Sequence, residues 1–434
     1  MTSAPSPRAS LNAYSPVAVA LAAVAFAFLV GWAVGPSSPP IDFDRADPAT
    51  YFQQAGPNGT DTAEQYRSRS RAIALFSIAA QIGLLSFLAL YRGPPMRRLL
   101  DRASRHPLRG AATLGALLAV ALALVGLPAA LLSFDLGRDY GLITQGLGGW
   151  AGDRLLSLAF SVALSAVAAL VAFAAWRRFR RRFWIVASAV AIVFAVVWLW
   201  LWPVAVSPLF NDFEPLPPGP VRSEVLDLAD RTGVDIGEVY SVDASRRSVA
   251  LNAYVHGIGS SKRVVIFDNV LATVPPRSLS ALIAHELAHV ESNDVYRGLA
   301  FAILVIPLGA LAMQLGAAAI ARRNGDRADG PGIVLSLALG LTLMSLLLSF
   351  PGNRLSREIE IRADYSALQT TDDPAAMIAL QRQIAASNLT DPDPPVLWQS
   401  LFGTHPATLD RIGLAEAWLR DGSSEDRSGG EPPP

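Results

Sequence analysis

The chain has 434 residues, of which 52% are hydrophobic, and its mean hydropathy is +0.35. This composition is too apolar for an ordinary soluble protein, and the length accommodates several membrane spans together with a soluble domain. The formal net charge is zero and no basic stripe with interleaved aromatic residues is present, so we expect no nucleic-acid partner. Because the chain has no cysteine, thiolate chemistry is excluded, and any metal must bind through His, Asp or Glu.

Seven apolar stretches are each long enough to cross about 30 Å of hydrocarbon, which predicts a polytopic membrane protein. The first could instead be a signal peptide, but its apolar region exceeds the usual length of roughly 7 to 15 residues and no small-x-small cleavage site follows. The predicted spans are Val17–Val34, Ala72–Tyr91, Ala111–Leu132, Leu155–Trp176, Trp184–Trp202, Leu299–Ile320 and Ile333–Phe350.

The region between the fifth and sixth spans has a different character. Five prolines between residues 208 and 220 mark an extended linker, and long apolar runs stop until about residue 299. Apolar residues at helical spacing follow from residue 221 to 229, and Glu238–Val242 predicts a short strand. Residues 249–256 alternate as a half-buried strand does, Gly257–Ser261 predicts a turn, and Arg263–Phe267 predicts a second strand. We therefore expect a soluble domain that contains a hairpin.

A His-Glu-x-x-His motif follows this hairpin at His285, Glu286 and His289. Two histidines four residues apart lie on one face of a helix and can bind one metal ion. The carboxylate of Glu286 can then reach a metal-bound water and take its proton. We expect this helix to begin after Pro275-Pro276 with Ser278 as its cap, and to run into the sixth span.

A catalytic zinc site usually has three protein ligands, and the charged segment after the seventh span is the best source of the third. Glu360 and Asp364 lie there one helical turn apart, so one can bind zinc while the other orients a histidine or a neighbouring arginine. The alternative is that these charges only anchor the end of a span at the lipid interface.

Several motifs in this order resemble the type I CAAX prenyl protease family of membrane-embedded zinc metalloproteases. The resemblance covers about residues 15 to 419. The motifs are residues 207–217; Arg246-Arg247-Ser248 with Asn252-Ala253-Tyr254; His285 to His289; Ser356-Arg357 with Glu360 and Ala363-Asp364; and Thr404-His405-Pro406 with Asp410-Arg411-Ile412.

The resemblance implies one Zn²⁺ per chain, held by His285, His289 and Glu360, with Glu286 as general base and later proton donor. It further implies a mainly α protein in which seven transmembrane helices surround a chamber, with a small α+β zincin-like domain at one end. His405 would face the site and stabilise the oxyanion, although it could instead cap the turn before Pro406. Asp364 and Arg357 would lie behind the ligands and hold them in orientation without binding the metal themselves.

The chain departs from this family at two places. Asp294 stands where the prenyl proteases tend to carry a further histidine, and the loop between Leu271 and Leu279 is short where eukaryotic members carry a long insertion. Both departures weaken the case for a prenylated substrate and leave the metal motif intact.

The alternating strand suggests how a substrate binds. Asn252, Ala253 and Tyr254 could pair with an extended peptide and place its scissile bond over the metal. The alternative is an ordinary edge strand. His256 on the same strand is interpreted as structural, because the set of three ligands is complete without it.

Arginines are distributed unevenly between the two faces that alternating spans define. The loops on the face of the N-terminus carry about fifteen, against about six in the short loops opposite. Such asymmetry marks the cytoplasmic side, so the charges predict an extracytoplasmic catalytic domain in a multi-pass protein of the cell membrane. The family's eukaryotic members point instead to a cytosol-facing site; we follow the charges, which belong to this chain.

The sequence thus predicts a zinc metalloendopeptidase that hydrolyses membrane-associated or misfolded proteins or peptides. An inactive membrane scaffold or transporter with the same fold is the alternative. The expected parts are residues 1–203 with five spans, 204–298 as the soluble domain, 299–350 with two spans, 351–420 as a helical part with the third ligand, and 421–434 as a disordered tail.

Overall fold

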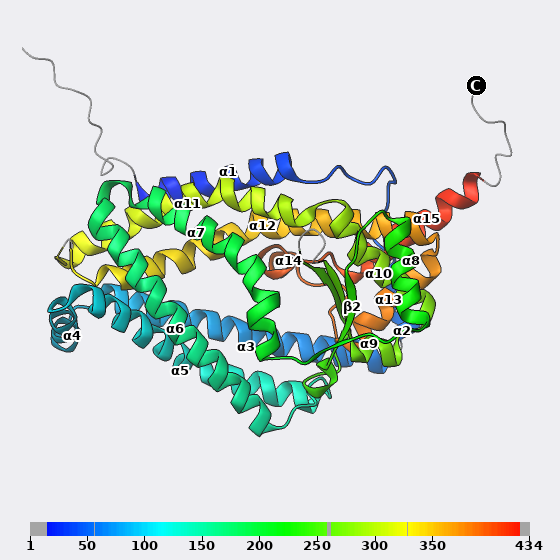
Figure 1. Cartoon of the computed structure of the whole chain (residues 1–434), viewed down its shortest axis with the longest axis horizontal. Coiled ribbons are helices and arrows are strands. Elements are labelled where there is room, and N and C mark those ends of the chain that lie inside the picture. The colour runs from blue at the N-terminus through cyan, green and yellow to red at the C-terminus, as the bar shows by residue number, and fades with distance from the viewer. Residues whose placement is uncertain (1–14, 56, 258–261, 328, 426–434) are drawn as a thin grey trace, which may run out of the picture.

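The computed structural model describes residues 15–55, 57–257, 262–327 and 329–425. Long helices form most of it, and a small sheet with short helices lies at one end of the long axis (Figure 1). The expected mainly α architecture with a small α+β part is confirmed. The long helices are α1 (Pro16–Val34), α3 (Pro57–Leu90), α5 (Pro107–Asp139), α6 (Leu147–Phe179), α7 (Phe183–Leu201), α11 (Asp294–Asn324) and α12 (Ile333–Thr371).

Among the described residues, six helical stretches are long and apolar enough to cross a membrane. One of them, residues 147–209, contains both α6 and α7, which a short 3-10 turn at Arg180–Arg182 separates. Each of the seven predicted spans therefore coincides with a long helix, except that Tyr91 lies just past α3 and Trp202 lies in a π-helical turn after α7. Several helices extend beyond the predicted ends. The most important extension is that of α12, which continues without a break from the seventh span through Glu360.

The membrane helices pack closely where small residues line their contacts. α1 packs along α11 and α12, and α5 packs along α6. A Cβ atom at Gly115 of α5 would lie 2.4 Å from the carbonyl oxygen of Ser165 in α6, so only glycine permits this approach. The end away from the sheet is tied together by the ion pair of Arg92 and Asp326, whose atoms are 2.7 Å apart. The basic segment α4 (Pro94–Ser104) lies at this same end (Figure 1).

The sheet has four strands in the order β1-β2-β4-β3. β2 and β4 have the predicted bounds, and β4 pairs with β3 in the predicted antiparallel hairpin. β3 is shorter than predicted, because the Asn269 side chain binds the carbonyl oxygens of Ser248 and Ala250 and draws that segment away from β4. β1 lies in the predicted linker, and residues 258–261 of the predicted turn fall outside the described ranges. The strands are β1 (Phe213–Pro215), β2 (Glu238–Val242), β3 (Ala253–His256) and β4 (Arg263–Phe267).

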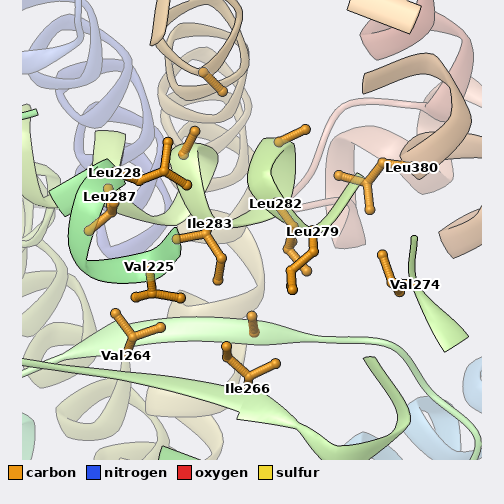
Figure 2. Packing of buried hydrophobic residues seen from close by; sticks show 14 of the residues in the cluster. Val225, Leu228, Val264, Ile266, Val274, Leu279, Leu282, Ile283, Leu287 and Leu380 are labelled. Atoms are coloured by element: carbon orange, nitrogen blue, oxygen red, sulfur yellow. The ribbon is translucent and has the colours of Figure 1, made fainter. Parts of the chain in front are cut away.

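The helix with the His-Glu-x-x-His motif, α10 (Pro276–Glu291), packs its apolar face on this sheet. Figure 2 shows Ile283 of α10 facing Val264 and Ile266 of β4, and all three side chains are fully buried. Burial of such side chains contributes roughly 1.5–3 kcal/mol each, which holds α10 at a fixed height over the sheet. The short helices that contribute to this core are α8 (Pro220–Arg231), α9 (Asp268–Thr273), α13 (Pro374–Ser387) and α15 (Thr408–Glu425). Two others, α2 (Pro48–Ala55) and α14 (Val396–Phe402), pack on α3 and α12.

Three expectations about helix ends are wrong. Pro275 is the cap of α10, whereas Ser278 is buried in its first turn and donates to the carbonyl oxygen of Ala376. α10 does not continue into the sixth span, because Asn293 adopts a left-handed conformation with φ of 57° and α11 starts afresh. The predicted disordered tail is helical as far as Glu425, and residues 426–434 lie outside the described part.

Candidate metal centre

Three of the predicted ligands converge between α10 and α12. The Nε2 atoms of His285 and His289 are 3.3 Å apart. The carboxylate of Glu360 approaches both, with Oε2 3.3 Å from His285 Nε2 and Oε1 3.6 Å from His289 Nε2. The rotation of α12 about its axis thus points Glu360, which lies one turn before Asp364, at the Nε2 atoms of the two histidines.

The donor atoms fit a divalent metal ion. Nitrogen and oxygen ligands at about 2.0–2.2 Å around a tetrahedral zinc ion lie about 3.3–3.6 Å from one another, close to the spacing observed. Glu360 Oε2 is buried, and His405 Nδ1 at 2.9 Å and His285 Nε2 at 3.3 Å approach it. A cation between the two histidines would neutralise this buried carboxylate. His285, His289 and Glu360 therefore form a group that could hold a metal.

A carboxylate stands behind each histidine. Asp364 Oδ1 lies 2.8 Å from His285 Nδ1, and Asp294 Oδ2 lies 3.0 Å from His289 Nδ1. Burial lowers the pKa of His285, but the carboxylates of Asp364 and Glu360 overcome this and raise that pKa to about 10. In both rings the Nδ1 atom is engaged and the Nε2 atom faces the other ligands, an arrangement typical of metal-bound histidines.

Arg411 of α15 completes this arrangement, and the sequence motif containing it indicated no role. Its Nε and Nη2 atoms donate to the two oxygens of Asp364 at 2.7 and 2.6 Å. Asp364 is completely buried, so this bidentate pair neutralises a charge that has no access to water. Burial opposes the charge on Arg411, but Asp364 raises the pKa of the guanidinium well above its usual range. Arg411 therefore holds the carboxylate that orients His285.

Glu286 lies beside the ligands on the same helix. Burial raises the pKa of its carboxyl group, while the neighbouring His285 and His289 oppose that rise. A carboxylate in such surroundings is a better proton acceptor than one in water. Its position next to the histidines suits proton transfer at this site.

His405 and Arg357 lie on the far side of Glu360. His405 Nδ1 is 2.9 Å from Glu360 Oε2, and the imidazole is 64% exposed. Arg357 donates to the carbonyl oxygens of Gln399 and Gly403, and Gln399 in turn donates to the carbonyl oxygen of His405. Within the described ranges, Arg357 makes no hydrogen bond or ion pair to the ligand group, so any effect on the metal passes through the loop that carries His405.

The predicted substrate residues lie at the free edge of the sheet. Asn252 is exposed, Ala253 is buried and Tyr254 is half-buried. A cavity of about 850 Å³ opens beside them, and its walls come from β3, α7, α10 and α11. Its lining includes Trp198, Trp202, Asn252, Tyr254, His256 and His289. One cavity thus joins the edge strand to a histidine of the metal group.

Replacing Asp294 should weaken metal binding, because His289 would lose the carboxylate that orients its ring. We expect Asp294→Ala to lower metal affinity about 10–100-fold, and Asp294→Asn, which keeps an acceptor oxygen, to lower it less. Competition with a chelator measures the affinity. Asp227→Asn, on the exposed face of α8, is the matched control. An unchanged metal affinity in Asp294→Ala would show that Asp294 does not contribute to metal binding.

Two family models match the chain. Residues 215–419 match peptidase family M48, and residues 48–212 match the model for the CAAX prenyl protease N-terminal region with five membrane helices. Among solved structures, the crystal structure of S. mikatae Ste24p has a TM-score of 0.72, with 21% identity over 96% of this chain and 100% of that one. This likeness concerns the fold.

Curated relatives agree with the family models. The chain is 30% identical over 381 residues to the uncharacterized metalloprotease YhfN of Bacillus subtilis (strain 168), which covers 86% of this chain and 88% of the relative. It is also 30% identical over 236 residues to a CAAX prenyl protease 1 homolog of Oryza sativa subsp. japonica, covering 51% and 53%. These matches do not favour an inactive scaffold. The chain belongs to peptidase family M48 and is a membrane-embedded metalloprotease.

Proposed function

We propose that this metalloprotease is a zinc endopeptidase with one zinc ion per chain, bound by His285, His289 and Glu360. The observation that carries the proposal is the convergence of these three side chains, whose donor atoms all lie within 4.8 Å of one another. Two imidazoles and one carboxylate, without thiolates, are a donor set typical of catalytic zinc. Asp364 supports His285 directly, and Arg357 supports the loop of His405.

The metal and the residues around it would have separate roles in hydrolysis of the peptide bond. Zinc, when bound, supplies a Lewis acid that polarises the scissile carbonyl and lowers the pKa of a water molecule. Glu286 accepts the proton of the attacking water and delivers it to the leaving amine. His405, now close to Glu360, would turn toward the substrate and donate a hydrogen bond to the oxyanion.

The substrate would bind as an extended strand on the free edge of β3, along Asn252, Ala253 and Tyr254. The neighbouring cavity is largely apolar and borders the ends of α7 and α11, so segments near the membrane surface have access to it. Membrane-associated or misfolded proteins and peptides are the substrate class that this position favours. A prenyl group is not part of the proposal, although relatives are named prenyl proteases.

The decisive experiment combines metal analysis with cleavage assays. The purified protein should contain about one zinc per chain and should cleave casein and some members of a peptide panel. The panel contains each peptide with and without a prenyl group. A protein that binds zinc and cleaves nothing would support the scaffold alternative, and cleavage of the prenylated members alone would overturn the proposed substrate class.

We further propose that the catalytic domain is extracytoplasmic, because the arginine-rich loops gather at the opposite end of the molecule. Since the chain has no cysteine, single introduced cysteines report the side directly. In intact cells, an impermeant maleimide should label Lys262→Cys and should label Arg180→Cys only after lysis. The reverse pattern would place the catalytic domain in the cytoplasm.

A further inference from the structure

The free edge of the sheet offers only part of its backbone to a partner. The amide of Phe267 in β4 donates to the carbonyl oxygen of Asn252, at 3.1 Å. Because successive residues of a strand alternate in the direction of their N–H and C=O groups, those of Leu251, Ala253 and Val255 point away from β4. These three residues are the positions at which an added strand could pair.

The first of these positions is already occupied by a side chain. The amide of Leu251 donates to Asn388 Oδ1 at 3.1 Å, and Asn388 Nδ2 donates to the carbonyl oxygen of Leu251 at 3.4 Å. The carboxamide thus makes with Leu251 the two bonds that a peptide group of a neighbouring strand would make. Across this edge, the described residues form no hydrogen bond to the outward groups of Ala253 or Val255.

The turn that contains Asn388 is held in place by two arginines of α3. Asn388 caps the end of α13, and Leu389 follows in the left-handed region with φ of 44°. Arg67 of α3 donates to the carbonyl oxygen of Asn388 at 2.6 Å and also to that of Leu389. Arg71, one turn later on α3, pairs with Asp391. These contacts keep the turn against the strand.

We propose that Asn388 closes the substrate cleft at its Leu251 end. A bound peptide would pair with Ala253 and Val255 and continue toward His256 and the cavity, but at Leu251 it must end or bend away. The enzyme would then act on bonds a few residues from a chain end or beside a kink. This inference rests on the proposed strand addition and specifies which peptides that mode accepts.

A nested set of peptides tests the closure. One cleavable peptide is extended residue by residue from either end, and kcat/KM is measured for each member. With the wild-type protein, extension at one end should be tolerated, whereas extension at the other beyond a limiting length should lower kcat/KM about tenfold. Equal tolerance of both extensions would overturn the closure while leaving the peptidase function intact.

Variants of Asn388 test whether this residue sets the limiting peptide length. In Asn388→Ala the groups of Leu251 become available, so the limiting length should increase by about two residues, the repeat of a strand. Faster hydrogen exchange at the Leu251 amide should accompany this change. Gln383→Ala, which removes a different side-chain contact of α13, is the control and should keep the wild-type limit.

Two further outcomes are distinguishable. If Asn388→Ala does not fold, Asn388→Ser keeps a polar residue at the end of α13 but is too short to bond both groups of Leu251, and it should show the same longer limit. An unchanged limit in the folded variant would overturn the role of Asn388. Failure of the wild-type protein to cleave any peptide would instead contradict the proposed peptidase function itself.

Discussion

Replacing Glu286 with glutamine should lower peptidase activity by about 10²–10⁴-fold while zinc remains bound. Glutamine keeps the size and position of the side chain but cannot accept a proton from the attacking water. His285, His289 and Glu360 are untouched, so the metal content should stay at the wild-type level. The measurements are casein cleavage and zinc content of the same preparation.

Glu291→Gln is the matched control, because it makes the same chemical change on the exposed end of α10. Its activity should equal that of the wild-type protein. Full activity in Glu286→Gln would contradict the proposed proton transfer by Glu286. Loss of zinc from that variant would instead assign Glu286 a part in holding the metal.

Replacing Arg411 with methionine should strongly destabilise the catalytic part. The substitution leaves the carboxylate of Asp364 buried without its bidentate partner. Breaking a buried ion pair on one side costs about 3–5 kcal/mol, a large share of the stability of most domains. Thermal unfolding in detergent should show a large drop in melting temperature, and zinc should dissociate more readily because Asp364 no longer holds His285 in place.

A double variant separates the effect of the unpaired Asp364 charge from the effect of losing the packing of the Arg411 side chain. In Arg411→Met with Asp364→Asn, no uncompensated charge is buried, so part of the lost stability should return. Arg420→Met, on the exposed end of α15, is the control for the loss of an arginine from this helix. If Arg411→Met melts like the wild-type protein, the ion pair does not stabilise the site.

Local patterns predicted most of the elements near the site. The bounds of β2 and β4 follow from continuous runs of strand-forming residues, and the long helices follow from apolar runs. β1 was not predicted within the extended linker, because it has only three residues and pairing with β2 stabilises it more than its own sequence does. The sequence pattern does not predict the break between α10 and α11, because one left-handed residue, Asn293, ends a helix without interrupting its polar pattern.

The sequence alone predicts that His285 and His289 share a helix face, because a spacing of four is a local property of the helix. It also determined that the metal must bind through nitrogen and oxygen. The spacing of the charged segment left Glu360 and Asp364 open as third ligand, the family resemblance implied Glu360, and the tertiary structure brings the Glu360 carboxylate close to the two Nε2 atoms. That choice depends on how α12 crosses α10, which no local pattern contains.

The same holds for the residues behind the site. Arg411 and His285 are 126 positions apart, and Asn388 and Leu251 are 137 apart. Contacts over such separations follow from the packing of whole helices on the sheet, since burial fixes their height and rotation. The sequence therefore predicted the donor atoms of a metal site, and the packing of α3, α13 and α15 decided which side chains lie behind the predicted ligands and which backbone group at the edge of the sheet is already bonded.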